Sequence, residues 1–173
     1  MIKLIIEVLE NNEVIEKIES QKDLFTINAL RLIYSCFPRG GITLIDEGGD
    51  SFPSGTTDDA WDTKLITSIG IGTGNTAPSF NDYKLENKIA ESGISIKNYT
   101  EDVQNNQIYF DIEANFNIAQ QTTIYEFGIF GLAFDTYYGE MRKILISRDV
   151  ISEGITVPAN STLKVTYRVY FSQ

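Results

Sequence analysis

The strongest pattern in the chain is an unbroken alternation of apolar and polar residues over positions 108–118. Successive side chains of a strand point to opposite faces, so this pattern predicts a strand with one buried face and one solvated face. The apolar face comprises Ile108, Phe110, Ile112, Ala114, Phe116 and Ile118, and the polar face comprises Tyr109, Asp111, Glu113, Asn115 and Asn117. Residues 163–171 alternate in the same way after a turn at Pro158-Ala-Asn-Ser, and predict a second strand of this kind.

Other segments carry weaker strand patterns. Residues 123–134 are apolar on both faces, which predicts a central strand that is covered on each side. The stretch Asp135-Thr-Tyr-Tyr-Gly-Glu predicts the turn into the next strand. Two strands are predicted at 2–9 and 13–19, and they form a hairpin around Asn11-Asn12 with the second strand at a half-exposed edge. Further strands are predicted at 42–45, 65–72 and 141–150, and a short strand or irregular segment at 84–90.

One helix is predicted near the start of the chain. Ser20 or Asp23 caps it, and it runs to about Phe37, where Pro38-Arg-Gly-Gly ends it. Its apolar face has helical spacing and comprises Phe25, Ala29, Leu32, Ile33 and Cys36. In a chain that is otherwise β, such a helix either closes one end of a sandwich or lies across one sheet.

Six to nine short strands separated by turns, with a single early helix, are typical of an antiparallel β-sandwich rather than a βαβ fold. The pattern does not distinguish a jelly roll from an immunoglobulin-like sandwich, because periodicity does not reveal strand order. We find no repeat and no linker, so residues 1–173 are predicted to form one domain. Two loops are expected, an acidic exposed one at 46–62 and a second at 75–83.

Composition narrows the possible functions. The chain has 14 basic and 24 acidic residues, a formal net charge of -10 and no Lys/Arg cluster, so contact with nucleic acid or an anionic membrane is not expected. Ten Phe and nine Tyr favour half-buried β surfaces and interfaces. Glu7 and Glu10 interrupt the first apolar run, which is unlike a signal peptide, and we expect synthesis and folding in a cytoplasm.

The chain has no His, and Cys36 is its single cysteine. This composition excludes a Ser/His/Asp triad, a Cys/His pair, a His- or Cys-based zinc site and an intrachain disulfide. Cys36 is predicted to be a small buried apolar residue. We therefore expect a protein that is not an enzyme, with no catalytic residues, no cofactor and no metal.

Several motifs admit a functional interpretation beside a structural one. The glycine-rich run Ile69-Gly-Ile-Gly-Thr-Gly-Asn-Thr resembles a phosphate-binding loop, but Pro78 follows where a helix should begin, so the glycines are predicted to let a strand bend where a Cβ would clash. The acidic loop 46–62 offers oxygen ligands for Ca²⁺ but lacks EF-hand spacing, so a solvated loop is favoured. Asp111 and Glu113 share a strand face that is interpreted as ordinary wet sheet rather than a glycosidase pair.

Glu126 interrupts the apolar run Ile124-Tyr-Glu-Phe-Gly-Ile-Phe, and a carboxylate in such a place needs a partner. Arg148 or Arg168 could supply it, as an ion pair that fixes strand register, and this interpretation is preferred over catalysis. Tyr137 and Tyr138, beside Phe134, predict an aromatic patch at a loop tip. Such a patch contacts either another subunit or a sugar, and the aromatic composition favours the subunit.

Four motifs follow one another in a definite order: Ile69 to Glu86 matches GTG-TAP---D--LE, and after the alternating strand come Glu126-Phe-Gly-Ile-Phe, Leu145-Ile-Ser-Arg-Asp-Val and Val157-Pro-Ala-Asn-Ser-Thr-Leu-Lys-Val-Thr-Tyr. This order resembles that of small structural proteins of tailed bacteriophages and some archaeal viruses, with Phe127 where Ile is commoner. The first hairpin and helix are also similar, so the resemblance spans nearly the whole chain.

The resemblance implies a virion component, such as a tail protein, a tail-fibre adaptor or a capsid-surface protein, and no catalytic residues. Its motifs are then fold determinants, with glycines in turns and Glu126 with Arg148 or Asp149 fixing strand register. We expect a homo-oligomer that also contacts other virion proteins and is located in the virion. The alternative is a carbohydrate-binding or receptor-binding adhesin module, and a hydrolase that uses only carboxylates ranks third.

Overall fold

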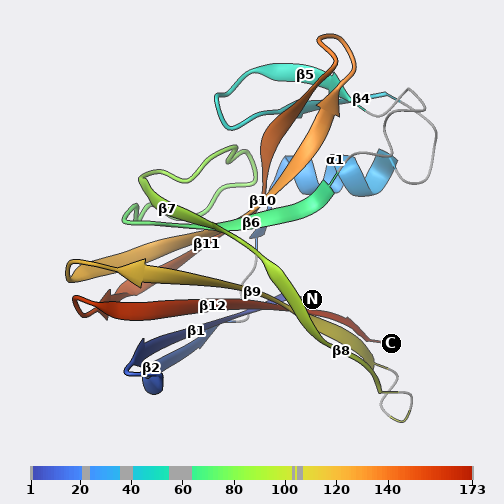
Figure 1. The fold of residues 1–173 in the computed structure, drawn as a ribbon. Coiled ribbons are helices and arrows are strands. Elements are labelled where there is room, and N and C mark those ends of the chain that lie inside the picture. The colour runs from blue at the N-terminus through green and yellow to red at the C-terminus, as the bar shows by residue number, and fades with distance from the viewer. Residues whose placement is uncertain are drawn as a thin grey trace.

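Two five-stranded sheets face each other in the computed structural model, which describes residues 2–20, 24–35, 41–54, 64–102, 104 and 107–172 (Figure 1). Sheet A is ordered β2 (Glu13–Ser20), β1 (Ile2–Glu10), β12 (Ser161–Ser172), β9 (Gln107–Ile118) and β8 (Ser95–Asp102). Sheet B is ordered β3 (Leu24–Phe25), β11 (Glu140–Val157), β10 (Thr122–Asp135), β6 (Lys64–Gly72) and β7 (Lys88–Gly93).

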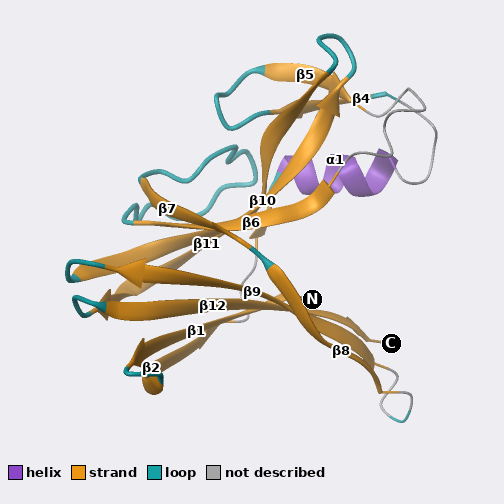
Figure 2. Cartoon of the chain, viewed as in Figure 1, coloured by secondary structure: helices purple, strands orange, loops and turns teal. Residues whose placement is uncertain are grey.

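A smaller hairpin of β4 (Ile42–Ile45) and β5 (Ser51–Ser54) lies near the far end of β10 and β11, with the helix α1 (Ile27–Ser35) beneath it (Figure 2). All of the strand pairings in the described residues are antiparallel. The predicted fold class, an antiparallel β-sandwich with one helix near the N-terminus, is confirmed. The described residues hold twelve strands, more than the six to nine predicted.

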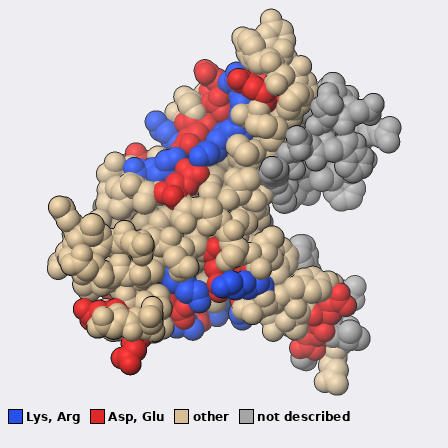
Figure 3. Space-filling model, in the orientation of Figure 1, with Lys and Arg blue, Asp and Glu red and all other residues tan. Residues whose placement is uncertain are grey.

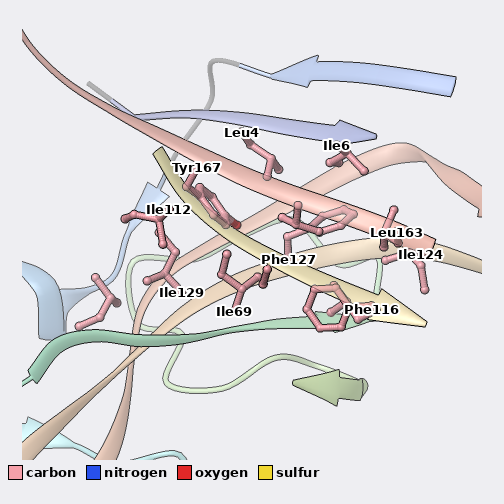
Figure 4. Packing of buried hydrophobic residues seen from close by; sticks show 14 of the residues in the cluster. Leu4, Ile6, Ile69, Ile112, Phe116, Ile124, Phe127, Ile129, Leu163 and Tyr167 are labelled. Atoms are coloured by element: carbon pink, nitrogen blue, oxygen red, sulfur yellow. The ribbon is translucent and has the colours of Figure 1, made fainter. Parts of the chain in front are cut away.

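The core lies between the inner faces of the two sheets (Figure 4). Sheet A contributes alternate residues of β1, β9 and β12, and sheet B contributes alternate residues of β6 and β10. The fully or almost fully buried side chains include Leu4, Ile6, Ile112, Leu163, Tyr167, Ile69, Phe127 and Ile129. Burial of each such side chain stabilises the fold by about 1.5–3 kcal/mol, and the period of two is what aligns them on one face.

Most of the predicted strands are present. The segment 108–118 lies within β9, 163–171 within β12, and 123–134 within β10, the central strand of sheet B. Asn11 and Asn12 both adopt positive φ angles, 52° and 66°, as a two-residue hairpin turn of type I′ requires. The strand predicted at 141–150 extends to Val157, because β11 continues past an excursion at 151–154 where Gly154 adopts a φ of 66°.

The helix prediction is wrong at its start. Ser20 belongs to β2, and Leu24 and Phe25 form β3 by pairing with Arg148 and Ser147, so neither Ser20 nor a helical Phe25 begins the helix. Pairing with β11 outcompetes the helical pattern there. Within α1, Ala29 is buried in the core as predicted, whereas Asp23, Cys36, Phe37 and Pro38 lie outside the described residues.

Two loop predictions also need correction. Residues 51–54 are not loop but strand β5, whose Phe52 is buried, and Pro53 is tolerated because it lies in a two-stranded hairpin with an open edge. Residues 55–63 lie outside the described part of the chain. β8 lies at 95–102, where no strand is predicted. The sequence gives no signal for it because its residues are mostly exposed and show no apolar alternation. Loop 75–83 is confirmed, and β7 begins only at Lys88.

The edge strands carry irregularities that protect them from pairing with another strand. Each of three edge strands has an extra residue against its neighbour: Ile15 in β2, Ile89 in β7 and the pair Asn98 and Tyr99 opposite Phe110 for β8. β3, the fourth edge strand of the two five-stranded sheets, is two residues long. Bulges and short edges break the row of backbone donors and acceptors that an incoming strand needs.

Loop 73–87 lies on the outer face of sheet B, over positions that lack side chains. Gly70 and Gly128 are cross-strand partners, and a Cβ on Gly128 would come within 2.8 Å of the Leu85 side chain. Leu85 is buried there with Phe130 and Leu145 in a second, smaller apolar cluster. The glycine-rich corner is therefore a trough that receives the loop. The predicted clash of a Cβ is confirmed, but its cause is the close approach of the loop, since Gly70 and Gly72 lie within β6 rather than in a tight turn.

Gly72→Ala should lower the free energy of unfolding by about 2 kcal/mol, because its Cβ would lie 2.5 Å from the carbonyl oxygen of Asn87, and backbone cannot easily move aside. Gly93→Ala is the matched control on the neighbouring strand, since a Cβ there meets no atom within 4 Å. Urea unfolding of both variants measures the difference. Equal stability of the two variants would contradict a close fit of the loop.

Candidate functional site

The candidate site is the anchored loop: residues 73–87 together with Glu126 of β10 and Arg148 of β11. Glu126 is fully buried. Its Oε1 accepts hydrogen bonds from the backbone N–H groups of Gly74, at 3.1 Å, and Asn87, at 2.6 Å. Its Oε2 accepts from the backbone N–H of Glu86 at 2.8 Å. One carboxylate thus holds both ends of the loop.

Arg148 completes the anchor. It is 3% exposed, and its Nε donates to Oε2 of Glu126 at 3.0 Å. Its Nη1 reaches Oδ2 of Asp82 at 3.0 Å, and its Nη2 lies 3.4 Å from Oγ1 of Thr76. The predicted partnership of Glu126 with Arg148 is confirmed, and the alternative partner Arg168 is not used. Four donors saturate the carboxylate oxygens, so the charge is stable without water.

The loop is also held within itself. Oε2 of Glu86 accepts hydrogen bonds from the backbone N–H and the hydroxyl of Thr76, at 3.1 and 2.9 Å, and these bonds lower the pKa of Glu86, with a further contribution from Arg148. Oδ2 of Asp82 accepts from the backbone N–H of Ser79 at 2.8 Å. The conspicuous residues of the GTG-TAP---D--LE segment, from Gly72 to Glu86, therefore meet in one contact set with Glu126 and Arg148.

This geometry bears on the phosphate-binding interpretation. After Gly72 the described chain continues as a loop without a helix, so no helix N-terminus faces the glycines. The backbone N–H groups of Gly74, Glu86 and Asn87 point at Glu126, a carboxylate of the chain itself. The donors that would cradle a phosphate are already occupied, which favours the structural interpretation.

Asp111 and Glu113 do not lie on a wet face, and that prediction is wrong. Asp111 is 2% exposed and Glu113 is 8% exposed. Asp111 accepts hydrogen bonds from Nε and Nη2 of Arg168, at 2.6 and 2.7 Å, and from Nδ2 of Asn98 at 2.7 Å. Long cationic side chains on neighbouring strands cover both carboxylates, so the polar face of β9 is dry at this end and exposed only at Asn115 and Asn117.

Glu113 belongs to a row of charges across sheet A. Its carboxylate lies 3.1 Å from Nζ of Lys97 and 3.3 Å from Nζ of Lys164, and Lys164 also pairs with Glu7 at 3.1 Å. The alternating signs link β1, β12, β9 and β8. Figure 3 shows that basic and acidic side chains also lie close together on the lower half of the molecule in that view. Asp111 and Glu113 therefore serve cross-strand pairing rather than acid–base catalysis.

Arg142, which the sequence did not single out, organises a second charged cluster. It pairs with Asp46 at 2.8 Å, with the fully buried Asp135 at 2.8 Å and with Glu140 at 3.1 Å. Asp46 of the acidic loop also accepts from the backbone N–H of Asp50 at 2.9 Å. Asp46 thus closes the turn of the β4–β5 hairpin.

Within the described ranges, no group of three or more His, Cys, Asp or Glu side chains is arranged to hold a metal ion.

Tyr137 and Tyr138 lie in the turn between β10 and β11, as the aromatic patch predicts, and are 75% and 69% exposed. Phe134 lies on β10 and is only partly buried. The structure thus supplies a charged, fully paired anchor on sheet B and an exposed aromatic pair at the hairpin tip. In the described residues, no helix is long and apolar enough to cross a membrane.

Glu126→Gln should lower the free energy of unfolding by about 3 kcal/mol, because the amide removes the fully buried counter-ion of Arg148 and leaves it only the more exposed carboxylates of Asp82 and Glu86. The control is Glu140→Gln, which also removes a carboxylate from an arginine but at a position 58% exposed, where the loss should stay below about 1 kcal/mol. Urea unfolding compares the two variants. Hydrogen exchange should also quicken at the amides of Gly74, Glu86 and Asn87, and equal effects of the two variants would contradict the anchor.

Asp111→Asn should destabilise the protein in a pH-dependent manner. The hydrogen bonds from Arg168 lower the pKa of Asp111 against the opposing effect of burial, and Asn98 adds to the lowering. A lowered pKa means that the charged form stabilises the fold above the usual value of 3.8, and that this stability is lost as the pH falls through the folded-state value. The difference in unfolding free energy between wild type and variant, about 2 kcal/mol at pH 7, should therefore narrow below pH 3.8. If the difference in unfolding free energy between wild type and variant stays constant from pH 7 to pH 2, the charged form of Asp111 is not what stabilises the fold.

Comparison with protein-family models, with curated proteins and with solved structures gave no match to this chain.

Proposed function

We propose that this protein is a non-enzymatic structural subunit of a virus particle, which assembles with itself and with other virion proteins at the tail or capsid surface. The observation that carries the proposal is the convergence of the ordered motifs on the anchored loop. Gly74, Thr76, Asp82, Glu86, Glu126 and Arg148 belong to three motifs that are far apart in sequence, yet they form one set of contacts.

This convergence supports the idea that the motifs specify a fold rather than a reaction. These six motif residues are engaged in holding the loop to sheet B, and Arg148 and Glu126 are both buried. The resemblance to virion structural proteins rests on these same residues. It is therefore best understood as similarity in a structural element, which is the kind of similarity that members of a family of assembly proteins share.

The pairing of four of the five buried carboxylates in the described residues supports a non-enzymatic role. Glu126, Asp111, Glu113 and Asp135 lie at 3.3 Å or less from an arginine or lysine nitrogen. A general acid or nucleophile needs a carboxylate that faces a substrate and has a tuned proton affinity. These four groups instead face cations of neighbouring strands, and their arrangement contributes to strand register.

The surface supports assembly through side chains rather than through strand addition. The edge strands are bulged or very short, so a partner gains little from extending either sheet. Exposed aromatic residues at the β10–β11 turn offer a side-chain contact instead. The exposure of Tyr137 and Tyr138 also favours the second candidate, a carbohydrate-binding or receptor-binding module, because sugars stack on exposed rings.

Mass spectrometry of purified particles tests the proposal. The chain should be present at a fixed ratio to the major virion proteins, and native mass spectrometry of the isolated protein should show a defined oligomer. If the chain is abundant in infected-cell lysate but missing from washed particles, that result contradicts the proposed structural role. Binding of the monomer to a glycan array would favour the second candidate.

A further inference from the structure

The turn between β10 and β11 forms a projecting, uncharged tip. Residues 136–139 are Thr, Tyr, Tyr and Gly, and the turn lies at the top of the molecule in Figure 1. In the same orientation, Figure 3 shows an uncharged cap directly above a band of mixed charge. Two adjacent aromatic side chains, 75% and 69% exposed, are costly to leave in water and are the residue type that dominates protein interfaces.

The backbone of the tip is fixed by one buried carboxylate. Oδ1 of Asp135 accepts hydrogen bonds from the backbone N–H groups of Tyr137, at 2.8 Å, and Tyr138, at 3.2 Å. The N–H of Gly139 donates to the carbonyl oxygen of Asp135 at 2.9 Å, and Gly139 adopts a φ of 72°, a conformation that favours glycine. Asp135 itself is fully buried, so the turn is held from beneath.

The tip is also braced from the side. The N–H of Thr136 donates to the carbonyl oxygen of Pro53 in β5 at 3.0 Å. The guanidinium of Arg142 lies 5.5 Å from the centre of the Phe52 ring and 5.4 Å from that of Tyr138. Ion pairs to Asp46 and Asp135 keep Arg142 in this position. The tyrosines are therefore presented in an ordered geometry, and a partner that binds them loses little additional conformational entropy.

We propose that Tyr137 and Tyr138 are an anchor that inserts into an apolar pocket with a basic rim on a neighbouring, different protein subunit of the same particle. The inference rests on the proposed function and adds the contact surface and the chemistry of the partner. Two observations favour a protein pocket over a sugar as the partner of these tyrosines.

The first ground is the arrangement of the rings. Their centroids are 4.7 Å apart and their planes meet at 87°, so the edge of one ring meets the face of the other. Arg142 also stacks over the Tyr138 ring. A sugar needs a flat, open aromatic face, whereas an edge-to-face pair with a cation on one ring makes a compact knob. Such a knob fits a pocket lined by apolar side chains.

The second ground is charge. The parts of the chain that surround the tip, residues 41–54 and 135–143, contain five acidic residues, Asp46, Glu47, Asp50, Asp135 and Glu140, and two basic residues, Arg142 and Lys143. The local formal charge is therefore -3, within a chain whose net charge is -10. At the tip, a second copy of such an acidic chain would be repelled, so the proposed self-association uses another surface, while a partner with Lys or Arg around its pocket would be attracted to the tip.

The test replaces the tip in the full-length protein during particle assembly. Tyr137→Ala with Tyr138→Ala should reduce the amount of the chain in purified particles at least 10-fold, a typical effect of losing an interface hot spot. Tyr99→Ala is the matched control, because Tyr99 is 63% exposed on β8 and far from the tip in sequence. Tyr138→Phe keeps the ring and should be incorporated normally. Urea unfolding shows whether the double variant is folded.

A photo-crosslinking residue identifies the partner in the same particles. Tyr138→benzoylphenylalanine should form an adduct with a different virion protein, at a site flanked by Lys or Arg, and Tyr99→benzoylphenylalanine should not. Normal incorporation of the folded double variant overturns the inference, as does an adduct only between copies of this chain or binding of a glycan that the double variant loses. If the wild-type chain is absent from particles, the proposed function is contradicted together with the anchor. If the wild-type chain is present and the double variant is incorporated equally well, only the proposed anchor is contradicted.

Discussion

A carboxylate that is removed from water stays charged only where protein groups replace the hydrogen bonds of its lost hydration shell. Glu126 meets this requirement with three backbone N–H groups and Arg148, and the way it does so determines the architecture of one face of sheet B. The loop must approach closely enough for its amides to reach the carboxylate. That approach requires glycine at positions 70, 72 and 128, because side chains there would hold the loop away from the sheet. Leu85 then fills the trough and packs against Phe130 and Leu145.

The two sheets use charge in different ways. On sheet B, a buried pair at the centre secures a long loop, so removing either partner affects many contacts. On sheet A, the charges form rows across neighbouring strands, where Lys164 bridges Glu7 and Glu113 and the lysine side chains remain partly solvated. Buried pairs specify geometry at a cost in desolvation, whereas partly solvated rows mainly favour one register and keep a face soluble. With these charges paired and the sheet edges bulged, the β10–β11 turn is an ordered apolar feature that is available for contact.

Residue patterns predicted the parts of the fold in which burial alternates without interruption. The segment 108–118 and the pairing of Glu126 with Arg148 were predictable because an apolar run makes a polar residue conspicuous. The strand at 95–102 was not, since an exposed edge strand needs no apolar face. The start of the helix failed because residues 24 and 25 pair with β11, a contact distant in sequence. The burial of Asp111 was equally unpredictable, because it depends on Arg168 of β12 and Asn98 of β8 covering a polar strand face.

The anchored loop also has a consequence for the order of folding. Glu126 lies 52 residues from Gly74, 39 from Asn87 and 22 from Arg148 along the chain. Its hydrogen bonds can therefore form only when β10 has paired with both β6 and β11, and until then a chain segment of 15 residues remains unsecured. Closing a contact between such distant residues is slow relative to forming a local hairpin. The loop is thus expected to be the last part of sheet B to become ordered, which makes its closure a marker that the sandwich has formed correctly.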